Sequence, residues 1–437
     1  MSTNVLLIGS GAREHAIAWK LRRSRRLGDL AVAPGNAGIA ELADTVPLPV
    51  PSAHASDHDV RTYGAAVVAL ARTRRADLVV VAPDDPLAFG LVDTVEAAGI
   101  AAFGPTKAAA RIEASKSFAK DLMRRHGIPM SENASFDDFD AAARYVESRP
   151  GGVVVKADGL TAGKGAIVTG SHAQAIDALR ELLVEGALGA AGRSVVIEDR
   201  LVGREASAHA FTDGKTIAHM PFSCDHKPVF DGNLGPNTGG MGVYSPPSWL
   251  DASVAHAIRR DITEKAVRAM AADGTPFKGV LYPGIFVTDN GPHVIEFNAR
   301  FGDPEAEALL PRLESDLLEI MLAVVGGTLD RVDVRWSEDA SITVMLASGG
   351  YPGAYETGKP ISGLDDLDSD IAIFHAGTKR DASGGFVTNG GRVLGVTATA
   401  PTIAEARARV YQNIERIRFD GMHYRTDIGA SEVAVHA

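Results

Sequence analysis

The stretch VIEFNARFGDPE, residues 294–305, is the segment around which the rest of the sequence can be organised. Val294 and Phe297 have the β-preferring character of a buried strand. Glu296 and Asn298 are two residues apart, so their side chains leave the same face of that strand. Two oxygen donors without a nearby His or Cys suit a hard cation that is shared with phosphates. The segment predicts a metal site, although a strand with a solvated polar face would show the same pattern.

Arg300 follows on the same face, and Gly302-Asp303-Pro304 ends the strand with turn residues. A carboxylate, an amide and a guanidinium in a row suit a metal-bound phosphate. Lys156 follows the apolar run 153–155 at the end of another predicted strand. An isolated charge at that place would be costly without an anionic partner. We therefore expect Arg300 to bind a metal-bound phosphate and Lys156 to have an anionic partner.

Bulk composition indicates a soluble α/β protein with several domains. At 437 residues the chain is too long for one hydrophobic core. The net charge of -11 argues against a general nucleic-acid binder. A single cysteine, Cys224, excludes an internal disulfide framework. No signal peptide and no long apolar run is apparent, so we expect a cytoplasmic protein that does not enter a membrane.

Apolar runs alternate with helical patterns at the start of the chain. Strands are predicted at residues 5–9, 30–33, 78–82 and 100–103, and helices at about 12–21, 59–75 and 86–98. A further helix is predicted at 112–126. The alternation predicts a doubly wound parallel sheet over residues 1–104.

The turn GSGAREH, residues 9–15, follows the first predicted strand. It is not a dinucleotide fingerprint, because Glu14 occupies the place of a small residue and no acid follows the second strand. What remains is a backbone nest at a helix N-terminus that suits one phosphate. A second glycine turn, APGNAG at 33–38, would face the same sheet edge. We expect substrate contacts from Gly9, Gly11, Arg13, Glu14, His15 and Asn36, with a ligand-free αβ turn as the alternative.

Lys156 begins the glycine-rich loop KADGLTAGKG, residues 156–165. The loop joins two predicted strands and could fold over a triphosphate as a flap. It is not a Walker loop, because Lys164 is followed by Gly165 and a strand. A later strand at 194–199 runs into the hinge 200–205, which could place amides and a Leu against an adenine. An edge strand and turn would fit that hinge equally well.

Together these features resemble the ATP-grasp ligases and, more narrowly, the phosphoribosylamine–glycine ligase family. The resemblance is carried by GSGAREHA (9–16), APGNAG (33–38), KADGLTAGKG (156–165), GPNTGGMGVYSP (235–246), VIEFNARFGDPE (294–305), GGYPGAYETG (349–358) and FHAGT (374–378). These segments span the chain. The sequence departs from the usual family pattern at Asp84, Pro228, Leu234, Pro283 and Glu307, where Glu307 replaces a customary Gln.

The resemblance implies an α/β and α+β multidomain protein: an ATP-grasp domain at 105–330 with a mobile lid at about 131–200, and a small mixed C-terminal domain at 331–437. It assigns Glu296 and Asn298 to Mg²⁺ or Mn²⁺, and it implies that Arg300, Lys156 and Asp303 are the catalytic residues. It assigns ATP contacts to Lys116, Lys156, Gly163, Lys164, Gly165, Glu198, Asp199, Leu201 and Glu205. It assigns the pocket for glycine and phosphoribosylamine to Asp225, Lys227, Asn237, Thr238, Gly239, Gly240, Met241 and Arg300.

The reaction implied is the ATP-dependent ligation of glycine to 5-phosphoribosylamine in de novo purine biosynthesis. A glycyl phosphate intermediate would form, and the products would be glycinamide ribonucleotide, ADP and phosphate. We expect small-molecule partners only, and a monomer or weak dimer. One alternative is another purine-pathway ATP-grasp ligase that acts on formate or bicarbonate. A regulatory nucleotide-binding protein is a second alternative, but it would not need to keep Glu296, Asn298 and Arg300 together.

Overall fold

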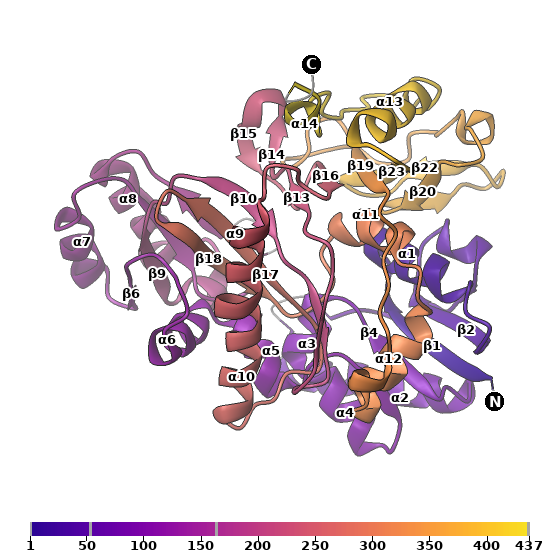
Figure 1. Ribbon diagram of the computed structural model, residues 1–437, viewed down its shortest axis with the longest axis horizontal. Coiled ribbons are helices and arrows are strands. Elements are labelled where there is room, and N and C mark those ends of the chain that lie inside the picture. The colour runs from indigo at the N-terminus through magenta and orange to yellow at the C-terminus, as the bar shows by residue number, and fades with distance from the viewer. Residues whose placement is uncertain (1, 52–54, 162–164, 435–437) are drawn as a thin grey trace.

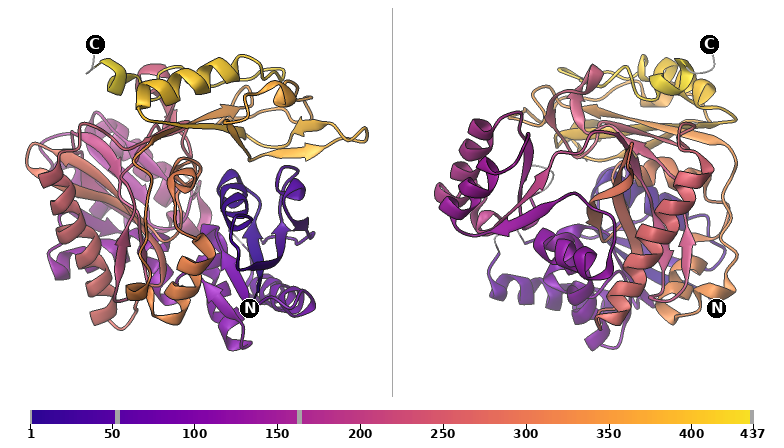
Figure 2. Two further views of the ribbon diagram at one scale, coloured as in Figure 1. Left: turned by 45° about the vertical axis from the view of Figure 1, so that its right-hand side comes forward. Right: turned by 60° about the vertical axis from the view of Figure 1, so that its left-hand side comes forward.

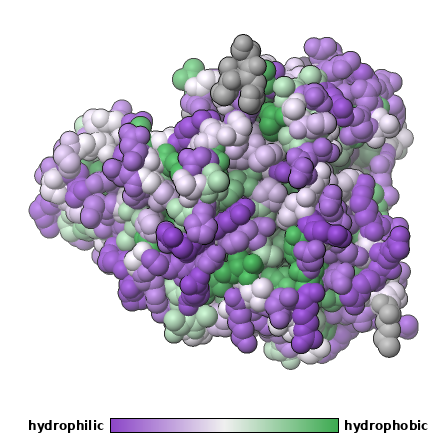
Figure 3. Space-filling view, viewed as in Figure 1, coloured by the Kyte–Doolittle hydropathy of each residue, from purple (hydrophilic) through white to green (hydrophobic). Residues whose placement is uncertain are grey.

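The computed structural model describes residues 2–51, 55–161 and 165–434. Figures 1 and 2 show an N-terminal sheet, a central region with a projecting lobe, and a C-terminal sheet that covers one end of the molecule. The face in Figure 3 is mostly hydrophilic, with small hydrophobic areas between polar side chains. No helix within the described ranges is long and apolar enough to cross a membrane.

The N-terminal sheet is parallel, with the strand order β3-β2-β1-β4-β5. Its strands are β1 (Thr3–Gly9), β2 (Leu27–Pro34), β3 (Asp44–Thr45), β4 (Leu78–Val81) and β5 (Ala101–Phe103). The helices are α1 (Ala12–Leu21), α2 (Asp57–Thr73), α3 (Asp84–Phe89) and α4 (Leu91–Ala97). The strand order reverses between β1 and β4, so the carboxyl ends of these two strands flank a crevice. The predicted doubly wound sheet is confirmed.

Two predicted helices are each divided in the structure. The helix expected at 86–98 is split into α3 and α4 at Gly90, whose φ of +85° favours glycine. The helix expected at 112–126 is split into α5 (Lys107–Ala114) and α6 (Lys116–His126) at Ser115. Ser115 is extended, and its hydroxyl accepts from the Phe118 amide as the N-cap of α6. Apolar spacing continues across both breaks, so periodicity alone did not reveal them.

The projecting lobe on the left of Figure 1 is a small antiparallel sheet with its own core. Its strand order is β6-β9-β7-β8. The strands are β6 (Asn133–Phe136), β7 (Val153–Ala157), β8 (Ala166–Val168) and β9 (Val195–Asp199). The helices are α7 (Phe139–Glu147) and α8 (His172–Leu179), followed by the turns η2 (Arg180–Val184) and η3 (Gly189–Gly192). The buried Val155, Leu179 and Ile197 hold helices and sheet together.

The central sheet is built on the long strand β17 (Gly279–Thr288). One edge of β17 pairs with β18 (Gly291–Asn298), and the other pairs with β10 (Arg204–Ser207) and β11 (Ala210–Thr212). The remaining elements are β12 (Ile217–His219), α9 (Ala252–Ala257), η5 (Ile258–Glu264), α10 (Lys265–Ala272), α11 (Glu305–Arg312) and α12 (Leu317–Gly326). Gly284 opposes Glu296 while Ile285 opposes Val294, so Ile295 forms a bulge in β18.

The C-terminal sheet takes in strands from the middle of the chain. Its order is β13-β16-β19-β23-β20. The strands are β13 (Cys224–Asp225), β16 (Gly242–Ser245), β19 (Ala340–Ala347), β20 (Ala372–His375) and β23 (Arg392–Ala400). Two hairpins, β14 (Pro228–Phe230) with β15 (Leu234–Asn237) and β21 (Thr378–Arg380) with β22 (Phe386–Thr388), flank it, and α13 (Ile403–Ile414) and α14 (Ala430–Ala434) follow. Residues 225–241, which we call the substrate loop, are therefore anchored at each end in this sheet.

Candidate active site

A buried ionic cluster joins the lobe to helix α6. The carboxylate of Glu198 lies 2.8 Å from the ammonium groups of both Lys156 and Lys120. The Ser131 hydroxyl also donates to Glu198 at 2.9 Å. Burial opposes ionisation of Glu198, but the two lysines outweigh it and lower its pKa to about 2. The cluster thus holds two positive charges at the edge of the lobe, where ATP phosphates were expected.

Lys120 was not among the residues predicted from the sequence to bind ATP. It lies on the buried face of α6 with Ala119, Leu122 and Met123, and only 2% of it is exposed. A lysine within the apolar stripe of a helix was the signal that could have identified it, because such a lysine needs an anionic partner. Lys116 begins the same helix, and its ammonium donates to the Gly159 carbonyl at 3.2 Å. Burial lowers the pKa of Lys116.

The bulge in β18 connects this cluster to the predicted metal strand. The Lys156 ammonium donates to the Ile295 carbonyl at 2.9 Å. Ile295 is the bulged residue, so its carbonyl is released from regular pairing and is available to an external donor. The next residue, Glu296, is consequently placed close to the lysines.

Glu296 and Asn298 lie in β18 two residues apart, as predicted. Lys227 lies 3.7 Å from Glu296 and also forms an ion pair with Glu205. Burial raises the pKa of Glu296, but the charges of Lys227, Lys156 and other nearby cations outweigh burial and lower it. Within the described part of the chain, no group of three or more His, Cys, Asp or Glu side chains could enclose a metal. Two hard oxygen donors completed by phosphate oxygens fit the coordination habit of Mg²⁺.

Arg300 is fixed at the end of the metal strand by two acids. Its guanidinium lies 2.9 Å from Glu113 and 3.9 Å from Asp84. Burial lowers the pKa of Arg300, but Glu113 and Asp84 outweigh that effect and raise it. Glu113 also accepts from the Ala299 amide at 2.8 Å. Glu113, on α5, is a second residue that sequence analysis missed, and it pre-orients the predicted catalytic arginine.

The nest after β1 is occupied by a side chain of the nest itself. The Gly11 amide donates to Glu14 at 2.6 Å, and Arg13 Nε donates to the same carboxylate at 2.6 Å. Gly9 has a φ of +130°, and a Cβ there would lie 2.4 Å from Glu14 Cγ. A phosphate would therefore need Glu14 to move before it could bind these amides. The phosphate contact predicted for Gly9, Gly11 and Arg13 stays a prediction.

Two other residues predicted to bind substrate contact the C-terminal sheet. The Asn36 amide donates to the His375 carbonyl at 2.6 Å and to the Ser10 carbonyl at 2.8 Å. The His375 amide donates to His15 Nδ1 at 2.8 Å. Burial and the neighbouring His375 lower the pKa of His15 to about 3, so its ring is neutral near pH 7. These contacts join the crevice to the loop after β20.

Arg392, at the start of β23, links Asp303 to the substrate loop. Its guanidinium lies 2.9 Å from the Asp303 carboxylate and donates to the Asp303 carbonyl at 2.8 Å. It also donates to the Gly239 carbonyl at 2.8 Å. Arg392 belongs to none of the recognised motifs and lies 89 residues from Asp303. They meet only in the folded protein, where the start of β23 lies against the turn between β18 and α11.

The substrate loop is folded on itself around Lys227. The Thr238 hydroxyl and amide both donate to the Lys227 carbonyl, at 2.7 and 2.9 Å. Gly240 has a φ of +115°, and a Cβ there would lie 2.4 Å from Pro304. Met241 is fully buried in a small apolar cluster with Val229, so its side chain is part of the core. Asp225 is buried, while Asn237 and Gly239 are exposed.

The remaining predicted ATP residues lie around the hinge. Asp199 forms an ion pair with Arg149 on the face of β9 opposite to Glu198. Leu201 is half-buried between β9 and β10, and Glu205 is paired with Lys227. The Gly165 carbonyl accepts from the Ala157 amide at 2.8 Å at the start of β8. Gly163 and Lys164 lie outside the described residues.

Comparison with known proteins finds matches along most of the chain. Profiles of phosphoribosylglycinamide synthetase match residues 3–113 (N domain), 114–306 (ATP-grasp (A) domain) and 341–431 (C domain). The phosphoribosylamine–glycine ligase of Rhizobium meliloti (strain 1021) is 46% identical over 430 residues, which cover 98% of this chain and 99% of that protein. This chain belongs to the phosphoribosylglycinamide synthetase family. The family expected from the sequence motifs is thus confirmed.

Other members of the synthetase family give the same result. The phosphoribosylamine–glycine ligase of Halalkalibacterium halodurans is 45% identical, covering 99% of this chain and 98% of that protein. The crystal structure of the phosphoribosylamine–glycine ligase from Thermotoga maritima matches with a TM-score of 0.83 and 30% identity, covering 97% of this chain and all of that one. A biotin carboxylase from Campylobacter jejuni, at a TM-score of 0.73 and 16% identity over 97% of this chain and 93% of that one, shares the fold alone. The predicted ATP-grasp architecture is confirmed.

Proposed function

We propose that this chain ligates glycine to 5-phosphoribosylamine at the expense of ATP, giving glycinamide ribonucleotide, ADP and phosphate. The observation that carries the proposal is one constellation. Glu296 and Asn298 lie at the end of β18, and Arg300 follows two residues later. Lys156 is next to them and donates to the carbonyl of the bulged residue Ile295. The sequence identity of 46% to a phosphoribosylamine–glycine ligase, over 98% of this chain, supports the choice of substrates.

On the nucleotide side, Lys116 and Lys156 would hold the ATP phosphates, with Lys120 behind them. Glu198 keeps Lys156 in place through the 2.8 Å ion pair. Leu201 and Glu205 would contact the nucleoside from the hinge. Glu296 and Asn298 would hold Mg²⁺ or Mn²⁺, which when bound neutralises charge on phosphate oxygens.

The chemistry would run in two steps. The glycine carboxylate attacks the γ-phosphoryl group, releasing ADP and giving glycyl phosphate. The amine then attacks the acyl carbon and phosphate leaves. Lys156 and Arg300 stabilise negative charge in both steps, because Glu198 and Glu113 hold their side chains before substrate arrives.

On the amine side, the phosphate of phosphoribosylamine would bind at the crevice between β1 and β4. Arg13 supplies a cation at the nest, and Arg392 forms an ion pair with Asp303. The substrate loop would close this pocket with Lys227 and Asn237. Binding at Gly11 would require Glu14 to leave its amide.

We further propose domains at 1–104, 105–330 with a lid at about 131–200, and 331–437. We propose a monomer or weak dimer that acts in the cytoplasm on small molecules.

The decisive assay measures ADP formation with ribose 5-phosphate and ammonia as the amine source. Glycine should be required, and formate or bicarbonate should not replace it. ADP formation that depends on formate or bicarbonate would assign the chain to another ATP-grasp reaction. No ADP formation with any of the three would contradict a ligase function.

A further inference from the structure

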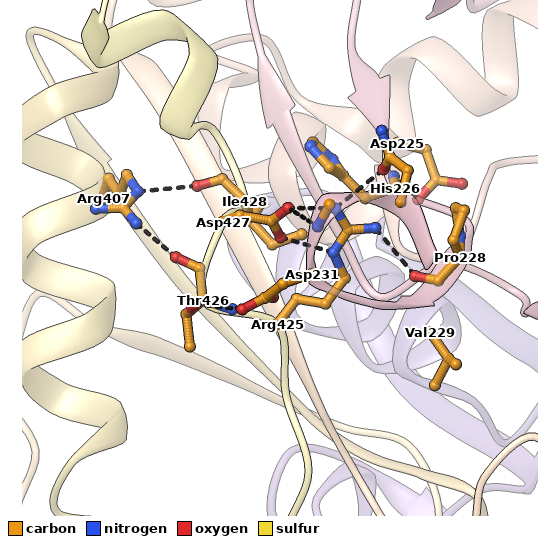
Figure 4. A network of polar contacts seen from close by, with 12 residues as sticks. Asp225, His226, Pro228, Val229, Asp231, Arg407, Arg425, Thr426, Asp427 and Ile428 are labelled. Carbon is orange, nitrogen blue, oxygen red and sulfur yellow. Dashed lines mark hydrogen bonds and ion pairs between the residues drawn. The ribbon is translucent and has the colours of Figure 1, made fainter. Parts of the chain in front are cut away.

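A segment near the C-terminus lies against the first half of the substrate loop. We call residues 423–428, with the sequence HYRTDI, the C-terminal strap. Figure 4 shows Arg425, Thr426 and Asp427 of the strap facing Pro228 and Asp231 of the loop. The two segments are nearly 200 residues apart in sequence, as the separation of 197 between Arg425 and Pro228 shows.

Arg425 is the centre of these contacts, and only 1% of it is exposed. Its Nε and Nη2 atoms donate to the two oxygens of Asp427, each at 2.7 Å. Its Nη1 donates to the Pro228 carbonyl at 3.0 Å, and Nη2 donates to Asn233 at 3.0 Å. A buried guanidinium is tolerated only when its donors are satisfied. Its position therefore depends on the substrate loop, and the loop's position depends on it.

Further bonds run in both directions between strap and loop. The Thr426 amide donates to Asp231 at 2.8 Å, and its hydroxyl donates to the same carboxylate. The Gly232 amide donates to Asp427 at 2.8 Å. His423 Nε2 lies 2.8 Å from the Val229 carbonyl. Contacts at successive residues leave little freedom for residues 228–233 to shift.

The strap itself is anchored to helix α13. The Tyr411 hydroxyl donates to the Arg425 carbonyl at 2.8 Å. Arg407 donates to the Ile428 carbonyl at 3.1 Å and to the Thr426 carbonyl. Through the strap, residues 228–233 of the loop are thereby fixed to a helix that packs on the C-terminal sheet.

Pro228 is the neighbour of Lys227, whose ammonium lies between Glu205 and Glu296. The hydrogen bond from Arg425 to the Pro228 carbonyl, one residue away from Lys227, restricts where the Lys227 side chain can reach. We propose that Arg425 is a positioning residue, which holds the substrate loop so that Lys227 and Asn237 meet the bound glycine and amine. This inference rests on the proposed function, because that function places those substrates against the loop.

The test compares Arg425→Gln with Arg416→Gln in the full-length protein. Arg416 is a matched control, because this partly exposed arginine in the turn after α13 bonds Asp368 and the Asp366 carbonyl instead of the substrate loop. Amide hydrogen exchange should speed up at residues 228–237 in Arg425→Gln alone. The KM values for glycine and for phosphoribosylamine should rise about tenfold or more, while the KM for ATP changes less. Arg425→Lys should fall between the wild type and Arg425→Gln, because it keeps the charge but not the paired geometry.

A residue that only stabilises the fold would lower kcat and the melting temperature with every KM unchanged. That result, with unaltered exchange at 228–237, would overturn the inference.

If Arg425→Gln does not fold, Asp231→Asn and Thr426→Val replace it, because both side chains are exposed at the strap–loop contact. They should shift exchange and KM in the same direction by a smaller amount, and unchanged values would again overturn the inference. A wild-type protein without glycine-dependent ADP formation would contradict the proposed function, whereas an active wild type with insensitive variants would contradict the strap alone.

Discussion

The two sides of the proposed active site, one for the nucleotide and one for the amine, are built differently. The proposed nucleotide side is a compact ionic cluster in which Lys120 and Lys156 each contact Glu198. Its residues come from the lobe and from α6, next to each other in space. The amine side is assembled from three distant parts of the chain: the nest after β1, the substrate loop, and residues Arg392 and Arg425 of the C-terminal region.

The difference has consequences for energetics. A buried cluster with paired charges is rigid, because removal of one partner leaves the others unpaired in a region that water does not reach. The amine side relies on bonds to backbone carbonyls between elements that meet only in the folded protein. We therefore expect changes on the nucleotide side to alter turnover or stability strongly, and changes on the amine side to alter substrate affinity.

The largest expected effect is that of Glu296→Ala. The carboxylate is partly exposed and near solvent, so the fold should survive while turnover falls by orders of magnitude. Asp289→Ala, in the exposed turn of the same hairpin, is the matched control. Steady-state rates and thermal unfolding measure the two outcomes. A Glu296→Ala protein that is active at ordinary Mg²⁺ would remove Glu296 from the metal site.

Arg13→Ala should affect the amine side alone. It removes a charge-assisted contact worth roughly 1.5–3 kcal/mol, which corresponds to an increase in the KM for phosphoribosylamine of about tenfold or more. Gly11→Val should act in the same direction, because its Cβ would lie 2.9 Å from Glu14 and 3.3 Å from Asp303. Initial-rate measurements with varied amine give the KM. An unchanged amine KM in both variants would place the ribose phosphate elsewhere.

Glu198→Gln should make the free energy of unfolding less dependent on pH in the acidic range. The folded-state pKa of Glu198 is about 2 and its usual value is 4.5, so the carboxylate stabilises the fold above pH 4.5. That contribution, roughly 3 kcal/mol at most, is lost as the pH falls from 4.5 towards 2. The gap in free energy of unfolding between wild type and Glu198→Gln should narrow over that range. A gap that is constant with pH would show that the lysines do not hold the carboxylate ionised.

The smallest effect is expected for Glu307→Gln. Burial, and then the charge of Asp303, raise the pKa of Glu307 well above its usual value of 4.5. The carboxyl group is therefore still protonated and neutral at a pH where a free Glu would be ionised. A neutral amide of similar shape should therefore leave turnover near the wild-type value. Because a raised pKa costs stability as the pH rises above 4.5, the variant should gain stability relative to wild type with increasing pH. Denaturant titrations at several pH values test this, and a large loss of stability would contradict it.

Sequence patterns predicted the elements that are local in the chain. The strand with Glu296 and Asn298 and the parallel sheet around Val5–Ile8 follow from periodicity and from residues a few positions apart. The fold class followed from the family motifs.

Contacts between residues far apart in the sequence were not predictable in this way. Nothing near Arg392 or Arg425 in the sequence marks them as partners of Asp303 or Pro228, since each contact joins segments that are distant in the chain. The sequence analysis also did not predict that Glu14 fills the nest. Its carboxylate reaches back three residues and accepts from the Gly11 amide, which a phosphate would otherwise bind.

The division between the two sides is tested most directly by equilibrium binding of ATP to Arg13→Ala and Lys156→Ala, measured side by side with the wild type. Arg13→Ala should bind ATP with the wild-type Kd. Lys156→Ala should bind ATP at least about tenfold more weakly, because it loses a cation expected at the phosphates and leaves Glu198 with one partner fewer. A loss of ATP affinity in Arg13→Ala, with unchanged affinity in Lys156→Ala, would make the turn after β1 a nucleotide site and contradict this account.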